Sequence, residues 1–230
     1  MAAETVLHPG LGDRLAEVRG GIADACRAAG RSEDEITLIV VTKFHPASLV
    51  RELAELGVRD VGENRHQEAQ EKAAELASLG LNWHYIGQLQ TKKARQAARY
   101  AHAIHSIDRD RLVDALADVE RPIDAFVQVN MTDDPGRGGV APDGIVELAE
   151  RVAAAPSLHL RGVMAVAPLE EDPARAFERL AGYSELVRSV DPAAAAISAG
   201  MTHDYAEAIA AGATHLRIGS AITGNRPDHR

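Results

Sequence analysis

The sequence predicts an α/β fold, a single (β/α)8 TIM barrel with an extra helix at its N-terminus. Short segments rich in branched apolar residues alternate with segments of helical periodicity, as expected for parallel strands joined by helices. Eight strand segments can be distinguished, evenly spaced and without a linker or low-complexity stretch between them. A doubly wound open sheet is the alternative, but it normally uses fewer strands and needs no eighth strand so close to the C-terminus.

The first predicted element is a helix that precedes the barrel, from about residue 12 to residue 29. Apolar residues recur in it at helical spacing, which predicts one buried face; they are Leu15, Val18, Ile22 and Cys26. We therefore expect one domain, residues 1–230, in which residues 1–30 hold the N-terminal helix and residues 36–224 form the barrel.

The remaining elements follow in the same alternation. The first strand is predicted at Ile36 to Val41, and Pro46 suits the first turn of the next helix, where a missing N–H costs nothing. A polar helix is expected to end near residue 79, a basic helix to run from 91 to about 100, and others to start near 142 and 173. Further strands are predicted at residues 58–62, 82–86, 103–106 and 123–129, within 158–166, at 194–197 and at 214–218.

The composition narrows the possible functions. A net charge of −9 argues against general nucleic-acid binding. No apolar run approaches the roughly 20 residues that cross a bilayer, and the first residues lack the charged and apolar regions of a signal peptide. The 10 histidines do not show the spacing of a zinc site. We therefore expect a cytoplasmic protein with no nucleic acid, membrane or metal as its partner.

Lys43 comes at the carboxyl end of the first predicted strand, one threonine after a run of branched apolar residues. In α/β barrels this end of the strands is where ligands bind. A lysine held there against apolar walls is partly desolvated, and its amine adds to an aldehyde to form a Schiff base. The alternative is a lysine that ends the strand in water.

The loops after the seventh and eighth strands commonly bind phosphate in such barrels. Here they read Ser198-Ala199-Gly200-Met201-Thr202 and Arg217-Ile218-Gly219-Ser220-Ala221. Each places a hydroxyl beside a glycine ahead of a helix or helical turn, so that backbone N–H groups and the helix dipole favour an anion. The alternative is that these residues only cap a helix and turn the chain.

Strand one neighbours strand eight in a closed barrel, which brings Lys43, both loops and Arg217 to one mouth. An amine beside a phosphate cradle suits an aldehyde that carries phosphate, and pyridoxal 5′-phosphate (PLP) has both groups. If Arg217 faces inward, it donates to the pyridine nitrogen and holds it unprotonated. Otherwise it forms a salt bridge on the barrel rim.

These residues belong to a series of short motifs whose order and spacing resemble those of the pyridoxal phosphate homeostasis proteins, single-domain relatives of the alanine racemase barrel. The motifs cover nearly the whole chain. They are Val41-Thr42-Lys43, Gly62-Glu63-Asn64 with Gln67-Glu68, Trp83-His84-Tyr85-Ile86-Gly87 with Leu89-Gln90, His105-Ser106-Ile107-Asp108, Gln128-Val129-Asn130, Arg161-Gly162-Val163-Met164, Ser198-Ala199-Gly200-Met201-Thr202-His203-Asp204, and Arg217-Ile218-Gly219-Ser220-Ala221-Ile222 with Gly224.

The resemblance implies a fold type III PLP barrel with a covalent aldimine of the cofactor on Lys43. It also implies Arg217 near the pyridine nitrogen, Asn64 and Met164 around the ring, and a phosphate site formed by Ser198, Gly200, Gly219 and Ser220. The chain departs from the family's pattern at three positions, which concern the pocket rim and not the cofactor; they are Arg65, Gln88 and Thr223.

The resemblance implies a non-catalytic protein that carries or buffers PLP and maintains vitamin B6 and amino-acid homeostasis, in transient contact with PLP-dependent apo-enzymes. The alternative is a PLP-dependent amino-acid racemase or another PLP enzyme of low activity. A racemase needs a second base opposite the lysine, which a tyrosine from an added β-domain of the partner subunit supplies in the two-domain relatives. Because the sequence stops at Arg230, we expect no such domain, a monomer, and no catalytic residue. Tyr85 and Tyr205 are the nearest replacements, and we expect both to pack or face solvent.

The stretch Lys92-Lys93-Ala94-Arg95-Gln96-Ala97-Ala98-Arg99 would suit a nucleic-acid or protein-binding module. On an acidic protein, a solvated helix face is the simpler interpretation. Lys92 and Lys93 would alternatively hold PLP in transit to or from the main site. The loop from Gly136 to Gly139 either cradles an anion or is a rim segment of the barrel.

Overall fold

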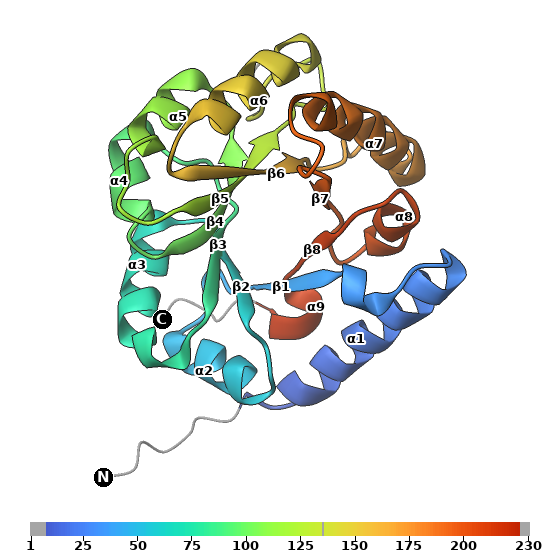
Figure 1. Ribbon diagram of the computed structural model, residues 1–230. Coiled ribbons are helices and arrows are strands. Elements are labelled where there is room, and N and C mark those ends of the chain that lie inside the picture. The colour runs from blue at the N-terminus through green and yellow to red at the C-terminus, as the bar shows by residue number, and fades with distance from the viewer. Residues whose placement is uncertain (1–7, 135, 226–230) are drawn as a thin grey trace.

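The computed structural model describes residues 8–134 and 136–225. Its eight strands are parallel, follow one another around the ring in sequence order and form a closed barrel (Figure 1). The last strand pairs with the first, so the barrel is closed, and the prediction of a TIM barrel is confirmed. The strands are β1 (Thr37–Val41), β2 (Asp60–Glu63), β3 (Asn82–Tyr85), β4 (Ala101–Ile107), β5 (Ile123–Gln128), β6 (Leu158–Met164), β7 (Ala196–Ser198) and β8 (His215–Ile218).

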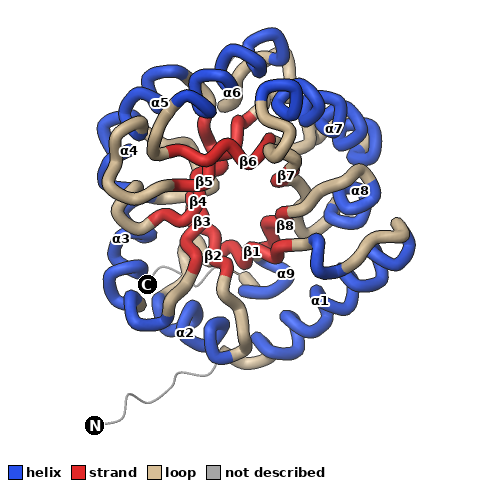
Figure 2. Tube along the Cα trace, viewed as in Figure 1, coloured by secondary structure: helices blue, strands red, loops and turns tan. Residues whose placement is uncertain are grey.

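The helices form an outer ring around the strands (Figure 2). Among the helices of the described residues, none combines the length and the apolar character needed to cross a membrane. They are α1 (Leu11–Ala28), α2 (Ala47–Glu55), α3 (His66–Glu75), α4 (Ala94–Ala97), α5 (Asp110–Leu116), α6 (Ile145–Ala154), α7 (Pro173–Val190), α8 (Tyr205–Ala210) and α9 (Ser220–Thr223).

The extra N-terminal helix is α1, and it packs against α8 and α9 at the end of the chain. Its buried face is the one that the sequence predicts, including Cys26, which is 1% exposed. Arg14 on this helix donates its Nε–H to the carbonyl oxygen of Ile222 at 2.7 Å. The N-terminal helix therefore supports α9 and the loop that leads into it.

The predicted basic helix is much shorter in the structure. A 3-10 turn at Thr91–Lys93 leads into α4, which has 4 residues. A turn at residues 98–100 separates α4 from β4. β4 begins two residues before the predicted start at 103, because Ala101 pairs with Trp83. The seventh strand is shifted in the opposite direction, to Ala196–Ser198, since the alanines before it carry no β-branched side chain.

Two apolar layers stabilise the barrel. The larger one fills the space between strands and helices, and a small one inside the barrel contains Ala103, Phe126 and Met164. Imidazole rings share this interior: the ring of His105 stacks on Phe126 with 4.2 Å between centroids, and His215 meets Phe126 edge-on at 5.1 Å. The barrel interior is thus unusually rich in polar rings, directly below the mouth where α/β barrels bind ligands.

Candidate functional site

A pocket of about 580 Å³ lies at the carboxyl ends of β1, β2 and β8, within the usual size range of small-molecule sites. Five of the eight predicted site residues line it: Lys43, Asn64, Arg217, Gly219 and Ser220. Met164, Ser198 and Gly200 do not line it. The pocket's wall is completed by Val41, Phe44, His45, Ile86, Val166, Leu169, Met201, Thr202, His203, Asp204, Thr223 and Gly224.

Lys43 sits in a tight turn between β1 and α2, and both of its neighbours are held from α3. Lys72 Nζ donates to the Thr42 carbonyl at 2.9 Å, and the Phe44 N–H donates to Glu68 Oε2 at 3.0 Å. Phe44 adopts a left-handed conformation with φ of 69°, which is rare for a bulky side chain and is kept only where the surroundings enforce it. Lys43 therefore points into the pocket from a backbone whose conformation is set by α3.

A buried ion pair lies beneath this turn. Lys72 Nζ is 2.6 Å from Glu63 Oε1, which also accepts a hydrogen bond from Thr42 Oγ1 at 2.7 Å. Burial raises the pKa of Glu63, although the charge of Lys72 and the two hydrogen bonds oppose the shift. Its Oε2 has no hydrogen-bond partner among the described residues. The pair joins α3 to the end of β2, and both of its members also bond to Thr42, the residue before Lys43.

Arg217 reaches the pocket from inside the barrel and is 5% exposed. One Nη group donates to Ser198 Oγ and the other to the Ala165 carbonyl, both at 2.8 Å. Burial lowers the pKa of Arg217 to about 10, against the opposing charge of Asp204, so the guanidinium remains a cation at neutral pH. The sequence left open an inward position or a rim salt bridge, and the structure places Arg217 inward.

The two predicted phosphate loops differ in the structure. Gly219 and Ser220 line the pocket, and the first N–H groups of the turn that starts at Ser220 have no partner within it. In the other loop, the Met201 N–H already donates to Asp204 Oδ1 at 2.6 Å. A carboxylate of the chain itself thus occupies the place where that loop would offer an N–H to an anion.

Ser198 and Gly200 lie below the pocket. The Ser198 side chain is fully buried and contacts His105 and Arg217 within the barrel. Gly200 has a φ of +91°, and a Cβ there would lie 2.8 Å from the Cβ of Ala208 on α8. The glycine therefore allows α8 to pack closely, which is a structural reason for it that needs no ligand.

Asn64 and Met164 were expected around a cofactor ring. Asn64 lines the pocket, and its Oδ1 is buried without a hydrogen-bond partner among the described residues. Such an atom is normally satisfied by a partner, which makes Asn64 a group that a ligand would complete. Met164 is 2% exposed and packs with Phe126 and Ala103 inside the barrel.

The sequence analysis missed several residues that shape the pocket. His45 is 7% exposed in its wall, and burial lowers the pKa of its imidazole. Asp204, Glu68 and Lys72 were also missed. The proline after His45 is a signal for a turn at this point, whereas nothing in the polar pattern of α3 marks Lys72 as buried.

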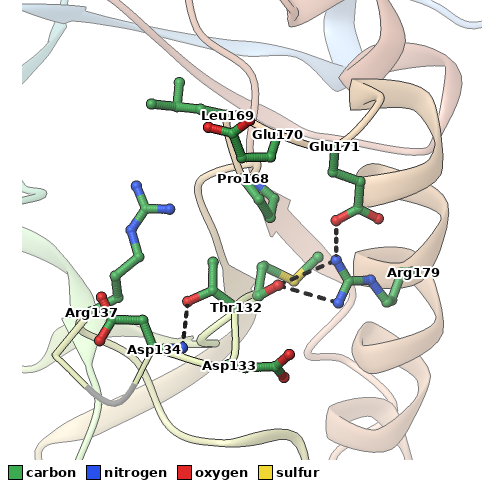
Figure 3. Close-up of a pocket in the computed structure, with 10 residues that line it drawn as sticks. Thr132, Asp133, Asp134, Arg137, Pro168, Leu169, Glu170, Glu171 and Arg179 are labelled. Atoms are coloured by element: carbon green, nitrogen blue, oxygen red, sulfur yellow. Dashed lines mark hydrogen bonds and ion pairs between the residues drawn. The ribbon is translucent and has the colours of Figure 1, made fainter.

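Two other hollows flank the pocket. One, of about 490 Å³, contains Lys93 and shares Asn64 with the main pocket, but Lys92 does not line it. The other, of about 640 Å³, lies between the loops after β5 and β6 (Figure 3). In the latter, Arg179 is paired with Glu171 and also donates to the Met131 carbonyl (Figure 3).

The larger hollow is a poor anion site. Its lining contains four carboxylates against two arginines; the carboxylates are Asp133, Asp134, Glu170 and Glu171. The Gly136 N–H of the glycine-rich loop donates to Asp134 Oδ1 at 2.8 Å. Of the two interpretations of that loop, the arrangement therefore favours the rim segment.

The sequence matches a known protein family and named relatives over nearly its whole length. The family described as alanine racemase, N-terminal domain, matches residues 23–227. A protein of Mycobacterium tuberculosis named pyridoxal phosphate homeostasis protein is 39% identical over 253 aligned positions, covering 98% of each chain. A protein of Escherichia coli with the same name is 39% identical over 222 positions, covering 92% of this chain and 95% of that protein.

Solved structures show the same fold. PipY of Synechococcus elongatus, solved with PLP bound, superposes with a TM-score of 0.80 at 31% identity and covers 93% of this chain and 100% of its own. Alanine racemase from Corynebacterium glutamicum superposes with a TM-score of 0.69 at 16% identity, over 92% of this chain and 62% of the enzyme. At that identity the likeness to the racemase concerns the fold.

Proposed function

Because this chain belongs to the pyridoxal phosphate homeostasis proteins, within the alanine racemase N-terminal domain family, we propose that it binds PLP in the pocket at the mouth of the barrel. We further propose that Lys43 holds the cofactor covalently and that the protein carries or buffers PLP without catalysing a reaction. The observation that supports this most strongly is the placement of Lys43 and Arg217 in one pocket.

The residues present fit PLP. When bound, PLP supplies an aldehyde that condenses with a primary amine, and Lys43 is the lysine that lines this pocket. Arg217 offers N–H groups to an aromatic nitrogen from a fixed position, because two of its other hydrogens are already bonded to Ser198 and Ala165. Gly219 and Ser220 offer backbone N–H groups to a phosphate. Asn64 supplies the buried oxygen that lacks a partner.

A role as carrier is supported by what surrounds the pocket. The Tyr85 hydroxyl donates to the Asn64 and Gln88 carbonyls, at 3.2 and 3.3 Å. The Tyr205 hydroxyl lies against Gly21 of α1, only 2.2 Å from where a Cβ would stand. Neither tyrosine lines the pocket, so neither is placed as a second base. A cationic Arg217 beside the pyridine nitrogen also opposes its protonation, which weakens the ring as an electron sink.

The proposal is tested by absorbance spectroscopy of the purified protein with added PLP, before and after borohydride. We expect a visible band in the wild type that borohydride removes by fixing the cofactor to the chain, and peptide mass spectrometry should find the added mass on Lys43. Lys43→Ala should lack the band. Lys93→Ala is the matched control, because it removes a lysine from the neighbouring hollow, and its band should equal that of the wild type.

Absence of the band in the wild type would contradict PLP binding through Lys43. A band that survives in Lys43→Ala but disappears in Lys93→Ala would move the covalent site to the neighbouring hollow. For the carrier role, a chiral assay on amino acids should detect no turnover above the Lys43→Ala background. Turnover by the wild type that Lys43→Ala loses would show an enzyme instead.

The organisation of the protein stays a prediction. We propose one domain of residues 1–230 that works as a cytoplasmic monomer and meets PLP-dependent apo-enzymes only transiently. Size-exclusion chromatography with light scattering measures the first part, and a stable dimer would contradict it. Reconstitution of a PLP-dependent apo-enzyme from the loaded protein, faster than from an equal amount of free PLP, would support direct transfer.

A further inference from the structure

A continuous chain of hydrogen bonds runs through the interior of the barrel from Arg217. Arg217 Nη1 and Ser198 Oγ are 2.8 Å apart, and Ser198 Oγ and His105 Nδ1 are 2.8 Å apart. His105 Nε2 lies 2.9 Å from His84 Nδ1, and His84 Nε2 lies 3.0 Å from Asp60 Oδ1. These residues come from β8, β7, β4, β3 and β2, so the chain crosses the barrel interior.

The two ends of this chain of hydrogen bonds, Arg217 and Asp60, lie on opposite sides of the barrel. Arg217 lines the pocket near the carboxyl end of β8. Asp60 is the first residue of β2, at the amino ends of the strands, and its side chain is 25% exposed. Ser198, His105 and His84 between them are at most 3% exposed. The chain therefore joins the pocket to solvent at the far mouth of the barrel.

The charges at the two ends set the direction of the two outer hydrogen bonds, and a single proton on each imidazole ring then sets the direction of those between them. Arg217 can only donate, so Ser198 Oγ accepts from it, and an ionised Asp60 can only accept, so His84 Nε2 donates to it. With Nε2–H directed at Asp60 and one proton on the ring, His84 accepts at Nδ1 from His105 Nε2–H. His105 in turn accepts at Nδ1 from the Ser198 hydroxyl. Each group thus donates to the next one, from the cation to the carboxylate.

We propose that Asp60, His84 and His105 are positioning residues that hold the Ser198 hydroxyl in one orientation and thereby hold Arg217 in place at the floor of the PLP pocket. The inference rests on the proposed function, because the ligand that Arg217 faces is PLP. The inference adds that a residue at the opposite end of the barrel, Asp60, affects the position of Arg217 in the PLP pocket. A change at Asp60 therefore alters PLP binding without touching the pocket.

The packing of the rings supports one fixed arrangement. His105 lies nearly parallel to Phe126, with 9° between the ring planes. Asp60 also accepts a hydrogen bond from Asn82 Nδ2 at 3.1 Å. Burial opposes ionisation of Asp60, but the hydrogen bonds from His84 and Asn82 outweigh it and lower its pKa. Burial lowers the pKa of His105 well below its usual value, so this ring is neutral.

Three other titratable groups lie around the two histidines: His102, His215 and Asp124. His102 on β4 meets His84 edge-on, and His215 on β8 lies between 6 and 7 Å from both rings, at 6.5 Å from His84 and 6.2 Å from His105. Burial lowers the pKa of both His102 and His215. Asp124 on β5 is engaged by Arg161 on β6 at 3.3 Å. Among these groups, the carboxylate hydrogen-bonded to His84 is Asp60.

The direction of the hydrogen bonds is measured by ¹⁵N NMR of histidine-labelled protein without PLP, which shows which ring nitrogen carries the proton. The signals are assigned through single His→Gln variants. In the wild type at neutral pH we expect both His84 and His105 to carry the proton on Nε2. Asp60→Asn offers N–H as well as C=O to His84, so both tautomers should appear at His84 and His105. His159→Gln removes an exposed histidine near the same mouth that is outside the chain, and it should leave these signals unchanged.

The coupling to the pocket is measured by titrating PLP into the labelled protein and by the dissociation constant for PLP. We expect the His105 signals to shift on binding in the wild type. In Asp60→Asn we expect about tenfold weaker binding, and in His159→Gln the wild-type value. A proton on Nδ1 of either ring in the wild type, or unchanged affinity in Asp60→Asn, would overturn the proposal. If the wild type binds no PLP, the proposed function fails, whereas the tautomers in the free protein still decide the direction of the chain.

Discussion

Lys72 Nζ lies 2.6 Å from Glu63 Oε1, and the two side chains are only 9% and 1% exposed. This buried ion pair joins α3 to the end of β2, and Lys72 also donates to the carbonyl of Thr42, the residue before Lys43. Removing one member of such a pair leaves an uncompensated buried group. The pair thus links the stability of the barrel to the position of the amine.

We expect Lys72→Met to lower the free energy of unfolding by about 3 kcal/mol, the lower end for a broken buried pair, because the Glu63 carboxyl, whose pKa burial raises, can take up a proton. Urea denaturation at neutral pH measures this. Lys92→Met, which changes an exposed lysine, should stay within about 0.5 kcal/mol of the wild type. Equal effects of the two substitutions would show that the pair contributes nothing.

The Phe44 N–H bond to Glu68 predicts an effect on PLP capture. Glu68→Ala removes the acceptor that holds the left-handed residue next to Lys43, so we expect PLP to attach to Lys43 about tenfold more slowly. Glu68→Gln keeps an oxygen acceptor and should restore most of the rate. The growth of the visible band after mixing with PLP measures it. Glu71→Ala, at an exposed position of the same helix, should match the wild type.

The half-buried His215 predicts that the protein loses stability in acid. Burial lowers the pKa of His215 to about 3, whereas the unfolded chain has a value of about 6.5. The unfolded state therefore binds more protons between these values. The stabilisation is complete above about pH 6.5 and is lost as the pH falls toward 3, at up to about 1.4 kcal/mol per pH unit.

Urea denaturation at pH 7.5, 6 and 5 measures this loss. His215→Gln should reduce the slope of stability against pH below about 6, and His159→Gln, at an exposed position, should leave the slope unchanged. A slope in His215→Gln equal to that of the wild type would show that His215 is not the source.

Gly200 predicts a packing defect. With a φ of +91° and Ala208 Cβ 2.8 Å from the position of a Cβ, Gly200→Ala forces strain on the loop and displaces α8. We expect a loss of about 2 kcal/mol in the free energy of unfolding. The matched control is Gly182→Ala in α7, where a Cβ meets nothing within 4 Å. This substitution should stabilise by about 0.5 kcal/mol or more, because alanine favours the helix.

The alternation of elements could be predicted from the sequence because each strand and helix carries its own local pattern. The helix Pro173–Val190 begins where the sequence predicts, and α1 buries the predicted residues. Element ends were less predictable. Ala101 becomes a strand residue because it pairs with Trp83, and this contact depends on how two strands meet in space.

The features of the site also divide into those that the sequence predicts and those that depend on contacts between distant elements. Lys43 follows strand one, Arg217 lies near the end of strand eight, and Gly219 and Ser220 follow it. Neighbouring parallel strands bring their carboxyl ends together, so the shared pocket of these residues could be predicted. The left-handed conformation of Phe44 and its bond to Glu68 have no local signal. They exist because α3 packs beside the turn after β1.

By itself, the sequence determined the closed barrel, the buried face of α1, and the lysine and arginine of the pocket. Each of these can be read from the chain, from the alternation of strand and helix segments, the helical spacing of apolar residues, and the positions of Lys43 and Arg217 near the ends of strands. The tertiary structure decided which groups the Ser198 hydroxyl contacts: the sequence predicts Ser198 at a phosphate, and in the fold its hydroxyl bonds to His105 and Arg217. Ser198 and His105 are 93 positions apart. Their contact arises only when the barrel closes and brings the inward side chains of opposite strands within hydrogen-bonding distance.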